Sequence, residues 1–431
     1  MKAAESSAKK KRSGELESGE SLPPAMAATE DGARTQALAS RWRHLWRTAP
    51  LNLDHGDLPS DREALAGVIS SILAVHRGPG RRFCVPTSYL EDRPATADSW
   101  LRSPALDNLQ EIDFSLPPAS TFRFSATLRV ATIGKCHIPD GLAQSLHFPQ
   151  LSQLALKEVI ISEETLHGLI SNCPVLECFL LSKCNGFRCA RINSSSLRAI
   201  GVQAEFYQHP ELQFWELIIE DAPCLERLLY AEHGGLKVSV ITAPKLKILG
   251  CFVGHYGDSI LVFGGTVFQG LNAVSLMTVV CSVKILAVDS WFTELDMIID
   301  LMKCFPCLEK LHIQTCHSVY QNLWRRKHKH FIQNYDIHLK SVVLGTYRGF
   351  RAQVNFASFF ILNATELEVM RIEVDSRDYN ESFFAEQHTR LQMEKRASRG
   401  AQLDFVTCRS HHDHRRINRF NDLALTDPFE C

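Results

Sequence analysis

The clearest pattern along this chain is a phrase of three apolar positions. Two variable residues separate the first from the second, and one variable residue separates the second from the third. The phrase recurs between residues 109 and 372, at steps that are mostly 19 to 31 residues long. The copies are Leu109-Ile112-Phe114, Leu128-Ala131-Ile133, Leu151-Leu154-Leu156, Leu176-Phe179-Leu181, Leu197-Ile200-Val202, Leu225-Leu228-Tyr230, Leu246-Leu249-Cys251, Leu271-Val274-Leu276, Leu308-Leu311-Ile313, Leu339-Val342-Leu344 and Leu367-Met370-Ile372.

This spacing predicts one short strand in each copy. The second and third apolar residues are two apart, so they point to the same face of a strand, and the first turns inward as the chain enters it. Several copies have a proline two positions before the first leucine, where its missing N–H costs no ladder hydrogen bond. Steps of this length are typical of leucine-rich repeats, which bury their apolar faces only against neighbouring repeats. We therefore predict an α/β leucine-rich-repeat solenoid with a parallel concave sheet.

Residues between the apolar positions are predicted to face out of the concave sheet, where a ligand would bind. They mix charged, polar and aromatic side chains, which suits a protein ligand. For any single one of them, a sheet face that meets only solvent is the simpler interpretation. The candidate substrate-binding residues are Lys157, Arg227, Phe252, Lys310, His312 and Gln314.

The segment ahead of the repeats divides into three parts. Residues 1–30 are polar and low in complexity, which predicts disorder. Their basic run Lys9–Arg12 is either a nuclear import address or a solvated charge run, so we expect the protein in the nucleus, the cytoplasm or both. Residues 31–54 contain a short helix, and residues 55–100 form a linker and N-terminal cap with a helix at 62–75 and a strand at 81–85.

The short helix in residues 31–54 places Leu38, Trp42, Leu45 and Trp46 along one face. A single helix of this length cannot bury two tryptophans by itself. Its apolar face therefore needs a surface to pack on, which is either a partner protein or the repeats of this chain.

Two segments resemble parts of one plant protein family. Arg41-Trp42-Arg43-His44-Leu45-Trp46, with the residues on either side, is similar to the second half of a plant F-box. Residues 336–431, which include Leu339-Lys340-Ser341-Val342-Val343-Leu344, resemble the FBD domain that follows the repeats in many plant F-box proteins. The resemblance implies that Leu38, Trp42, Leu45 and Trp46 bind a Skp-type adaptor and through it a cullin complex. It also implies that the irregular repeats at 101–335 bind an unknown protein substrate.

The resemblance is incomplete at its N-terminal side, which leaves two hypotheses about function. A family F-box begins with a further amphipathic helix, whereas residues 22–28 here, Leu-Pro-Pro-Ala-Met-Ala-Ala, contain none. The first hypothesis is a substrate-recognition subunit of a Skp-cullin-F-box (SCF) ubiquitin ligase. The alternative is a protein-binding repeat module that does not join a ligase because its F-box is truncated.

Candidate chemistry changes this picture little. The sequence contains no HExxH, GxSxG, P-loop or dinucleotide fingerprint, so we expect neither catalysis nor a cofactor. The net charge of −1 makes nucleic acid an improbable partner, and the basic run at 325–330 is most simply a solvated loop. The longest apolar run is about half the ~20 residues of a membrane-spanning helix. Cys304 and Cys307 have the spacing of a redox pair, but they belong to a repeat and are interpreted as structural thiols.

Overall fold

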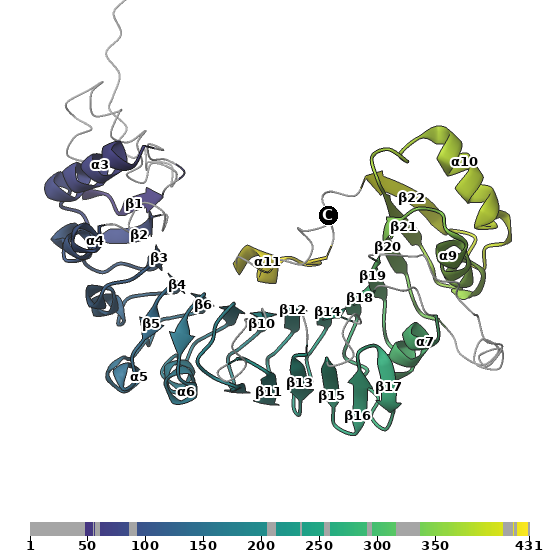
Figure 1. Cartoon of the computed structure of the whole chain (residues 1–431), viewed down its shortest axis with the longest axis horizontal. Helices are drawn as coiled ribbons and strands as arrows, with labels where there is room; N and C mark the ends of the chain where they lie inside the picture. Colours follow the sequence, from purple (N-terminus) through teal and green to yellow (C-terminus); the bar gives the residue numbers. More distant parts are fainter. Residues whose placement is uncertain are drawn as a thin grey trace, which may run out of the picture.

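The computed structural model describes residues 48–54, 56, 61–85, 93–204, 213–232, 235–253, 259–290, 295–315, 337–407, 417 and 420–429. Over these residues the chain forms an open arc, with a continuous parallel sheet on its inner side (Figure 1). In spatial order the strands are β1 (Leu51–Asp54), β2 (Gly80–Val85), β3 (Glu111–Ser115), β4 (Val130–Gly134), β6 (Gln153–Lys157), β8 (Cys178–Ser182), β10 (Ala199–Ala204), β12 (Arg227–Glu232), β14 (Ile248–Val253), β18 (Ile285–Ser290), β19 (Lys310–Thr315), β20 (Ser341–Tyr347), β21 (Val369–Val374) and β22 (Gln402–Thr407). The predicted solenoid with a parallel concave sheet is confirmed.

The apolar phrase fills the space behind this sheet, as the spacing predicts. Residues at the same place in successive copies pair directly, for example Phe179, Ile200 and Leu228 in β8, β10 and β12. Their side chains are fully buried. One cluster of buried apolar residues runs from Leu51 to Phe405, so each repeat completes the core of the next.

One predicted copy of the phrase is wrong. Val274 and Leu276 are 65% and 42% exposed, and the strand around Val274 belongs to a different sheet. The repeat at this point is Val283-Leu286-Val288, all buried, with Leu286 in β18. Apolar residues crowd this stretch, so more than one triplet has the right spacing. Only the pairing of β18 between β14 and β19 selects the correct one.

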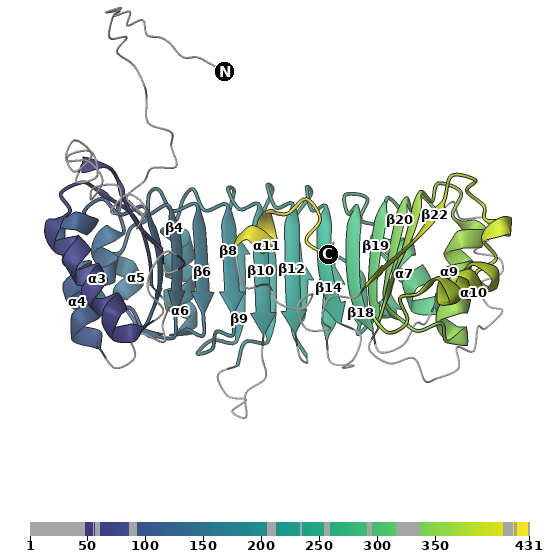
Figure 2. The ribbon, with the colours of Figure 1, turned by 90° about the horizontal axis from the view of Figure 1, so that it is seen from above.

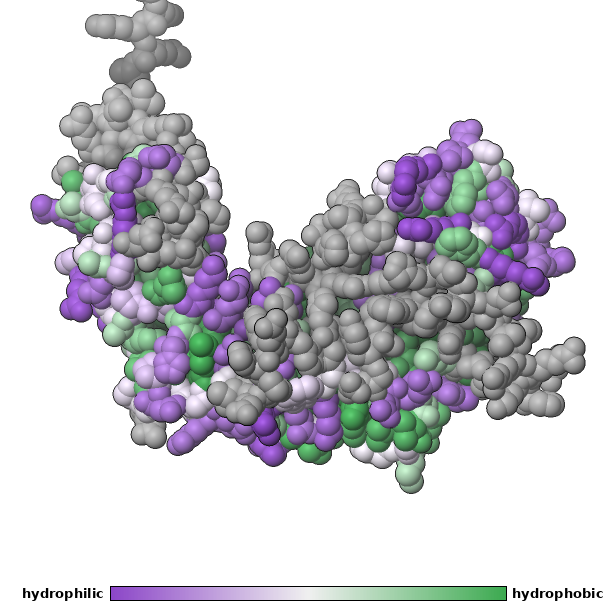
Figure 3. Space-filling view, in the orientation of Figure 1, coloured by the Kyte–Doolittle hydropathy of each residue, from purple (hydrophilic) through white to green (hydrophobic). Residues whose placement is uncertain are grey.

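The convex side changes character along the arc. In the middle it is a second sheet, whose order from one edge is β17 (Asn272–Ser275), β16 (Thr266–Gln269), β15 (Ile260–Phe263), β13 (Lys237–Val240), β11 (Glu216–Asp221) and β9 (Cys189–Asn193). Its strands β15, β16 and β17 form antiparallel hairpins that carry exposed apolar side chains. These side chains are visible along the lower edge of Figure 3. These side chains therefore lie on the side of the molecule opposite the concave sheet.

Helices cover the convex side toward the two ends of the arc. Asp61 begins the helix predicted at 62–75, because its side chain accepts a hydrogen bond from the Ala64 N–H at 2.9 Å. The helices are α3 (Arg62–Val75), α4 (Pro94–Leu101), α5 (Leu142–Ser145), α6 (Glu163–Ser171), α7 (Leu295–Cys304), α9 (Arg351–Asn363) and α10 (Glu381–Arg390), with 3-10 turns at Pro104–Leu106, Ala119–Phe124 and Met393–Lys395. A small two-stranded sheet, β5 (His137–Ile138) and β7 (Ile160–Ile161), links two repeats. No helix within the described ranges is long and apolar enough to cross a membrane.

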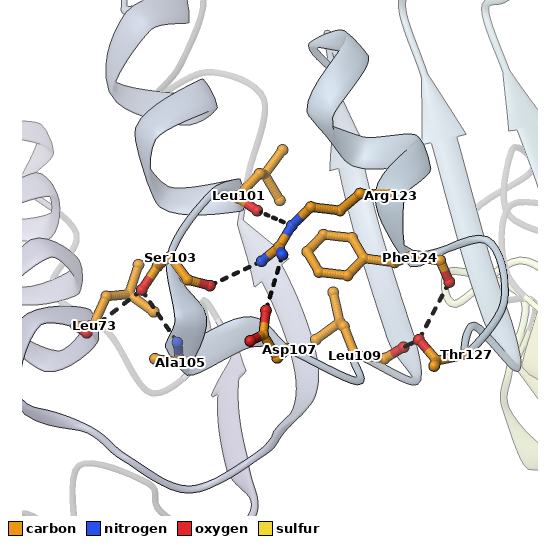
Figure 4. A network of polar contacts seen from close by, with 9 residues as sticks. All are labelled: Leu73, Leu101, Ser103, Ala105, Asp107, Leu109, Arg123, Phe124 and Thr127. Atoms are coloured by element: carbon orange, nitrogen blue, oxygen red, sulfur yellow. Dashed lines mark hydrogen bonds and ion pairs between the residues drawn. The ribbon is translucent and has the colours of Figure 1, made fainter.

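Where a repeat lacks a long helix, polar contacts tie its convex turn to the neighbouring repeat. Arg123 donates hydrogen bonds to the carbonyl oxygens of Leu101 and Ser103, at 2.6 and 2.8 Å, and pairs with Asp107 at 2.8 Å (Figure 4). Its guanidinium also lies 4.4 Å from the centre of the Phe124 ring. One side chain thereby satisfies backbone carbonyls that no helix ladder covers.

The C-terminal segment, here Ile417 and residues 420–429, lies inside the arc (Figure 1). Its short helix α11 (Phe420–Ala424) packs on β8 and β10, near the middle of the concave face (Figures 1 and 2). The sequence pattern does not predict this return of the chain.

The reassigned repeat predicts that Leu286 contributes more to the free energy of unfolding than Val274 does. Leu286→Ala removes a fully buried side chain and should destabilise the protein by about 2–5 kcal/mol. Val274→Ala, at the rejected position, should change stability by about 0.5 kcal/mol or less. Urea unfolding followed by circular dichroism measures both, and equal shifts of the two midpoints would contradict the assigned repeat.

Candidate binding surface on the concave sheet

Two rows of outward residues cross the concave face, and strand pairing defines both. In the first row the paired residues are Gln153, Cys178, Ala199, Arg227, Ile248, Ile285 and Lys310. In the second row they are Ala155, Leu180, Gly201, Leu229 and Gly250, followed by the pair Ala287 and His312. The middle of these two rows is therefore mostly apolar, and their charged residues are Arg227 on β12 and Lys310 on β19, with His312 beside Lys310.

The apolar strip, which we define as Ala155, Leu180, Ala199, Leu229 and Ile248, is buried although it faces out of the sheet. The C-terminal segment covers it. Leu423 and Ile417 join these residues in a cluster separate from the main core, and Phe420 and Phe429 pack against it. Full burial of a leucine contributes about 1.5–3 kcal/mol, so Leu423 is a main anchor of the segment.

Asp427 anchors the other half of the C-terminal segment through charge. Its Oδ2 lies 2.6 Å from the Lys310 Nζ and 3.0 Å from the His312 Nε2. Its Oδ1 accepts a hydrogen bond from the Phe429 N–H at 3.0 Å, and the Phe429 ring lies 5.5 Å from the His312 ring. The Asp427 side chain is only 10% exposed.

These contacts hold Asp427 in its ionised form. Burial acts to raise the pKa of Asp427, but the hydrogen bonds and positive charge of His312 and Lys310 outweigh it and lower the pKa well below the ordinary range. A lowered pKa in the folded state contributes stability above the unfolded value of about 4, and this contribution is lost as the pH falls through the folded value. The Asp427 carboxylate is therefore ionised at neutral pH.

A ladder of ion pairs borders one edge of the concave face. Its residues each follow the first apolar residue of a phrase, and the contacts join each carboxylate to two cations. Glu226 lies 2.8 Å from Arg198 and 3.5 Å from Lys247, and Glu309 lies 3.1 Å from both Lys284 and Lys340. These exposed pairs contribute about 0–1 kcal/mol each. Glu177 and Glu368 occupy the same position in the neighbouring repeats, so carboxylates and cations balance along this edge.

The structure brings only part of the predicted substrate-binding set together. Lys310 and His312 are neighbours on β19 and share Asp427. Gln314 instead donates a hydrogen bond to the Thr346 Oγ1 at 2.7 Å, so it links β19 to β20. Arg227 lies in the first row, and among the described residues its buried Nε has no hydrogen-bond partner. Lys157 lies at the far end of β6 and is half-buried.

Phe252 lies directly after an irregularity in β14. The register of β14 shifts between Leu249 and Phe252, so Phe252 pairs with Val288, a fully buried core residue. Between these two pairs β14 contains one more residue than β18, as in a β-bulge. The structure describes only the backbone of Phe252, so its outward position stays a prediction.

The described residues contain no candidate metal site, and three core cysteines are held as thiols. Where residues are described, no group of three or more His, Cys, Asp or Glu side chains is placed to hold a metal ion. Burial raises the pKa of the Cys173, Cys184 and Cys304 thiols to about 12, so these cysteines are protonated and unreactive at neutral pH. Cys304 thus fits the structural role predicted for it. The arrangement suits binding.

Comparison with known proteins assigns the family. A family model described as FBD-associated F-box protein At5g56370, LRR repeats, matches residues 97–313, which is half of the chain. The chain belongs to the plant F-box/FBD/LRR-repeat family. The match covers the strands from β3 to β19, which include the apolar strip and the Lys310–His312 pair.

Individual relatives of this F-box/FBD/LRR-repeat chain come from Arabidopsis thaliana. The F-box/FBD/LRR-repeat protein At1g13570 is 28% identical over 207 residues, which are 45% of this chain and 47% of the relative. The putative F-box/LRR-repeat protein At3g18150 is 23% identical over 230 residues, 52% of this chain and 47% of the relative. FBD-associated F-box protein At5g56370 is 29% identical over 175 residues, 36% and 39% of the two chains. The chain spans about half the length of the first two relatives and less of the third.

The predicted adaptor-binding residues Leu38, Trp42, Leu45 and Trp46 lie in the part of this F-box/FBD/LRR-repeat chain that the structure does not describe. The same holds for the basic runs at 9–12 and 325–330. The adaptor role thus stays a prediction.

Sequence reasoning missed the C-terminal segment. Leu423, Asp427 and Phe429 carry its contacts with the concave face of this F-box/FBD/LRR-repeat chain. A usable signal was present in the outward positions of the phrase, because Leu180, Leu229 and Ile248 are too apolar for a face that meets only water. That signal indicates a cover, but not which segment supplies it.

Loss of the Asp427 charge should loosen the C-terminal segment. Asp427→Asn removes the ionic contacts to Lys310 and His312, and we expect the amides of residues 420–429 to exchange about tenfold faster, which corresponds to about 1.4 kcal/mol. Hydrogen exchange read by mass spectrometry measures this. The matched control is Asp404→Asn on β22, which removes a pairing with Arg371 and should leave exchange in 420–429 unchanged. Equal exchange in both variants would contradict the anchoring role of Asp427.

Proposed function

We propose that this chain is the substrate-recognition subunit of an SCF ubiquitin ligase and binds its target protein through the leucine-rich repeats. The proposal rests on family membership and on the form of the concave surface. A partner protein would be held by the repeats, while the F-box segment would connect it to the ligase.

One observation supports the proposal most directly. The concave face is a continuous parallel sheet whose centre is apolar and whose borders carry Lys310, His312 and the edge of ion pairs. Solenoids use extended concave surfaces of this kind to bind other macromolecules. An apolar centre with a polar rim is the usual composition of a protein-protein interface.

Such a subunit would act by proximity and not by bond chemistry. Tethering a substrate raises the effective concentration of its lysines near the ubiquitin-carrying enzyme of the complex. The repeats would contribute selectivity and orientation. No residue of this chain is assigned a role in forming or breaking a bond.

The alternative function is a protein-binding module that does not join a ligase. It is favoured by one feature of the sequence, the absence of an amphipathic helix at residues 22–28, where the resemblance to an F-box would require one. In that case the concave face would bind a partner without delivering it for ubiquitylation.

Adaptor capture separates the two functions. Immobilised full chain is offered purified Skp-type adaptor, and the same is done for Trp42→Ala/Trp46→Ala. If the helix face binds the adaptor, the double variant should capture at least tenfold less, because buried tryptophans contribute a large share of interface energy.

The matched control is Arg43→Ala/Arg47→Ala, which changes the same predicted helix away from its apolar stripe. We expect capture by this control to stay within about threefold of the wild type, as for rim charges. If the wild type captures no more adaptor than the tryptophan variant, the ligase function is rejected in favour of the binding module.

A further inference from the structure

The C-terminal segment lies on the surface where a ligand of the repeats would bind. Figure 2 shows α11 over β8 and β10, with the chain continuing across β12 toward β14. The segment engages this surface in three ways, through apolar contact, a close fit at two glycines and a charge anchor.

The apolar contact and the fit occur together at the strip. Leu423 is fully buried there although it lies outside the main core. A Cβ atom at Gly201 would lie 2.8 Å from the Leu423 Cδ2 and 3.0 Å from the Ile417 Cγ2. Glycine at this outward position therefore leaves the room that the segment occupies.

The second fit is at Gly250, next to the charge anchor. A Cβ atom at Gly250 would lie 2.9 Å from the Phe429 Cζ and 2.7 Å from the Ala287 Cβ, so the C-terminal segment and the neighbouring strand both leave no room for a side chain there. Phe429 follows Asp427 by two residues, its N–H donates a hydrogen bond to the Asp427 carboxylate, and its ring lies 5.5 Å from the His312 ring. Lys310 and His312 both lie on β19. Lys310 pairs with the Asp427 carboxylate, and the His312 ring packs beside the Phe429 ring.

The segment has the features of a bound peptide more than those of a repeat. Its helix of five residues is too short to be stable alone, and its apolar side chains are buried against the strip. The strip cluster is distinct from the core cluster that holds the repeats together. The solenoid core therefore does not depend on Leu423, Asp427 or Phe429.

We propose that the apolar strip and the Lys310–His312 pair form a peptide-binding site, and that the C-terminal segment occupies it in the free protein. The site takes a segment of a partner protein that carries one apolar helical turn, then an aspartate and a phenylalanine two residues later. A partner must displace the C-terminal segment, which has the advantage of belonging to the same chain. That this partner is a ubiquitylation substrate rests on the proposed function, whereas peptide binding does not.

Direct binding of a synthetic peptide tests the site. The probe is a fluorescein-labelled peptide of residues 417–429, and its anisotropy is measured with the full chain and with the full-length variant Leu423→Ser/Asp427→Ala/Phe429→Ala. We expect the variant to bind the peptide at least tenfold more tightly than the wild type, because its own segment no longer competes.

Two further substitutions locate the binding within the variant. Lys310→Ala/His312→Ala should weaken peptide binding at least tenfold, since both groups contact the carboxylate. Lys340→Ala, an exposed cation that pairs with Glu309 at the edge of the sheet, should leave it unchanged. A folded variant that binds no peptide, or binds it equally with and without Lys310 and His312, overturns the proposal.

A second measurement uses the wild type and does not require the variant to fold. Excess heavy-isotope-labelled peptide of residues 417–429 should raise hydrogen exchange in residues 420–429 of the chain at least fivefold. The same peptide with alanine in place of Asp427 and Phe429 should not. Unchanged exchange would show that the segment is a fixed part of the fold and overturn the proposal. Neither measurement contains the adaptor, so failure here is distinct from failure of the ligase function.

Discussion

Parallel hydrogen bonding between the strand of one repeat and the strand of the next is the constraint on which the structure depends. It pairs equivalent positions residue by residue, so Ile200 lies between Phe179 and Leu228 and the three phrases share one core. Once that register is satisfied, the chain between strands is free to vary. Helices, 3-10 turns tied by Arg123 and a second sheet all cover the convex side without disturbing the pairing.

Local spacing predicts the concave layer well because a strand needs only a few residues to show its inward face. It fails where apolar residues are too dense to be selective, as at Val274 and Leu276, and it does not predict the register shift in β14 between Leu249 and Phe252. Both have the same origin. The pairing partner decides the register, and a partner strand is not visible in a short window of sequence.

The binding surface is predictable in its parts but not in its occupancy. Lys310 and His312 were identified because alternation along a strand turns them outward. The carboxylate that they share is Asp427, which lies 115 residues after His312. No periodicity connects residues that far apart. A contact of this kind depends on the path of the whole chain, whereas burial of outward apolar residues such as Leu180 only reveals that some cover exists.

The two-sheet middle of the molecule also determines its curvature. Neighbouring strands lie about 4.8 Å apart, whereas packed helices need about 10 Å. Where both layers are strands, the inner and the outer layer of each repeat advance by equal steps. The arc therefore stays nearly straight there, as along β10–β14 in Figure 1. Helices at the ends spread the outer layer and bend the arms inward. The straight stretch presents the apolar strip as a flat floor, on which an extended or singly turned segment can lie without bending.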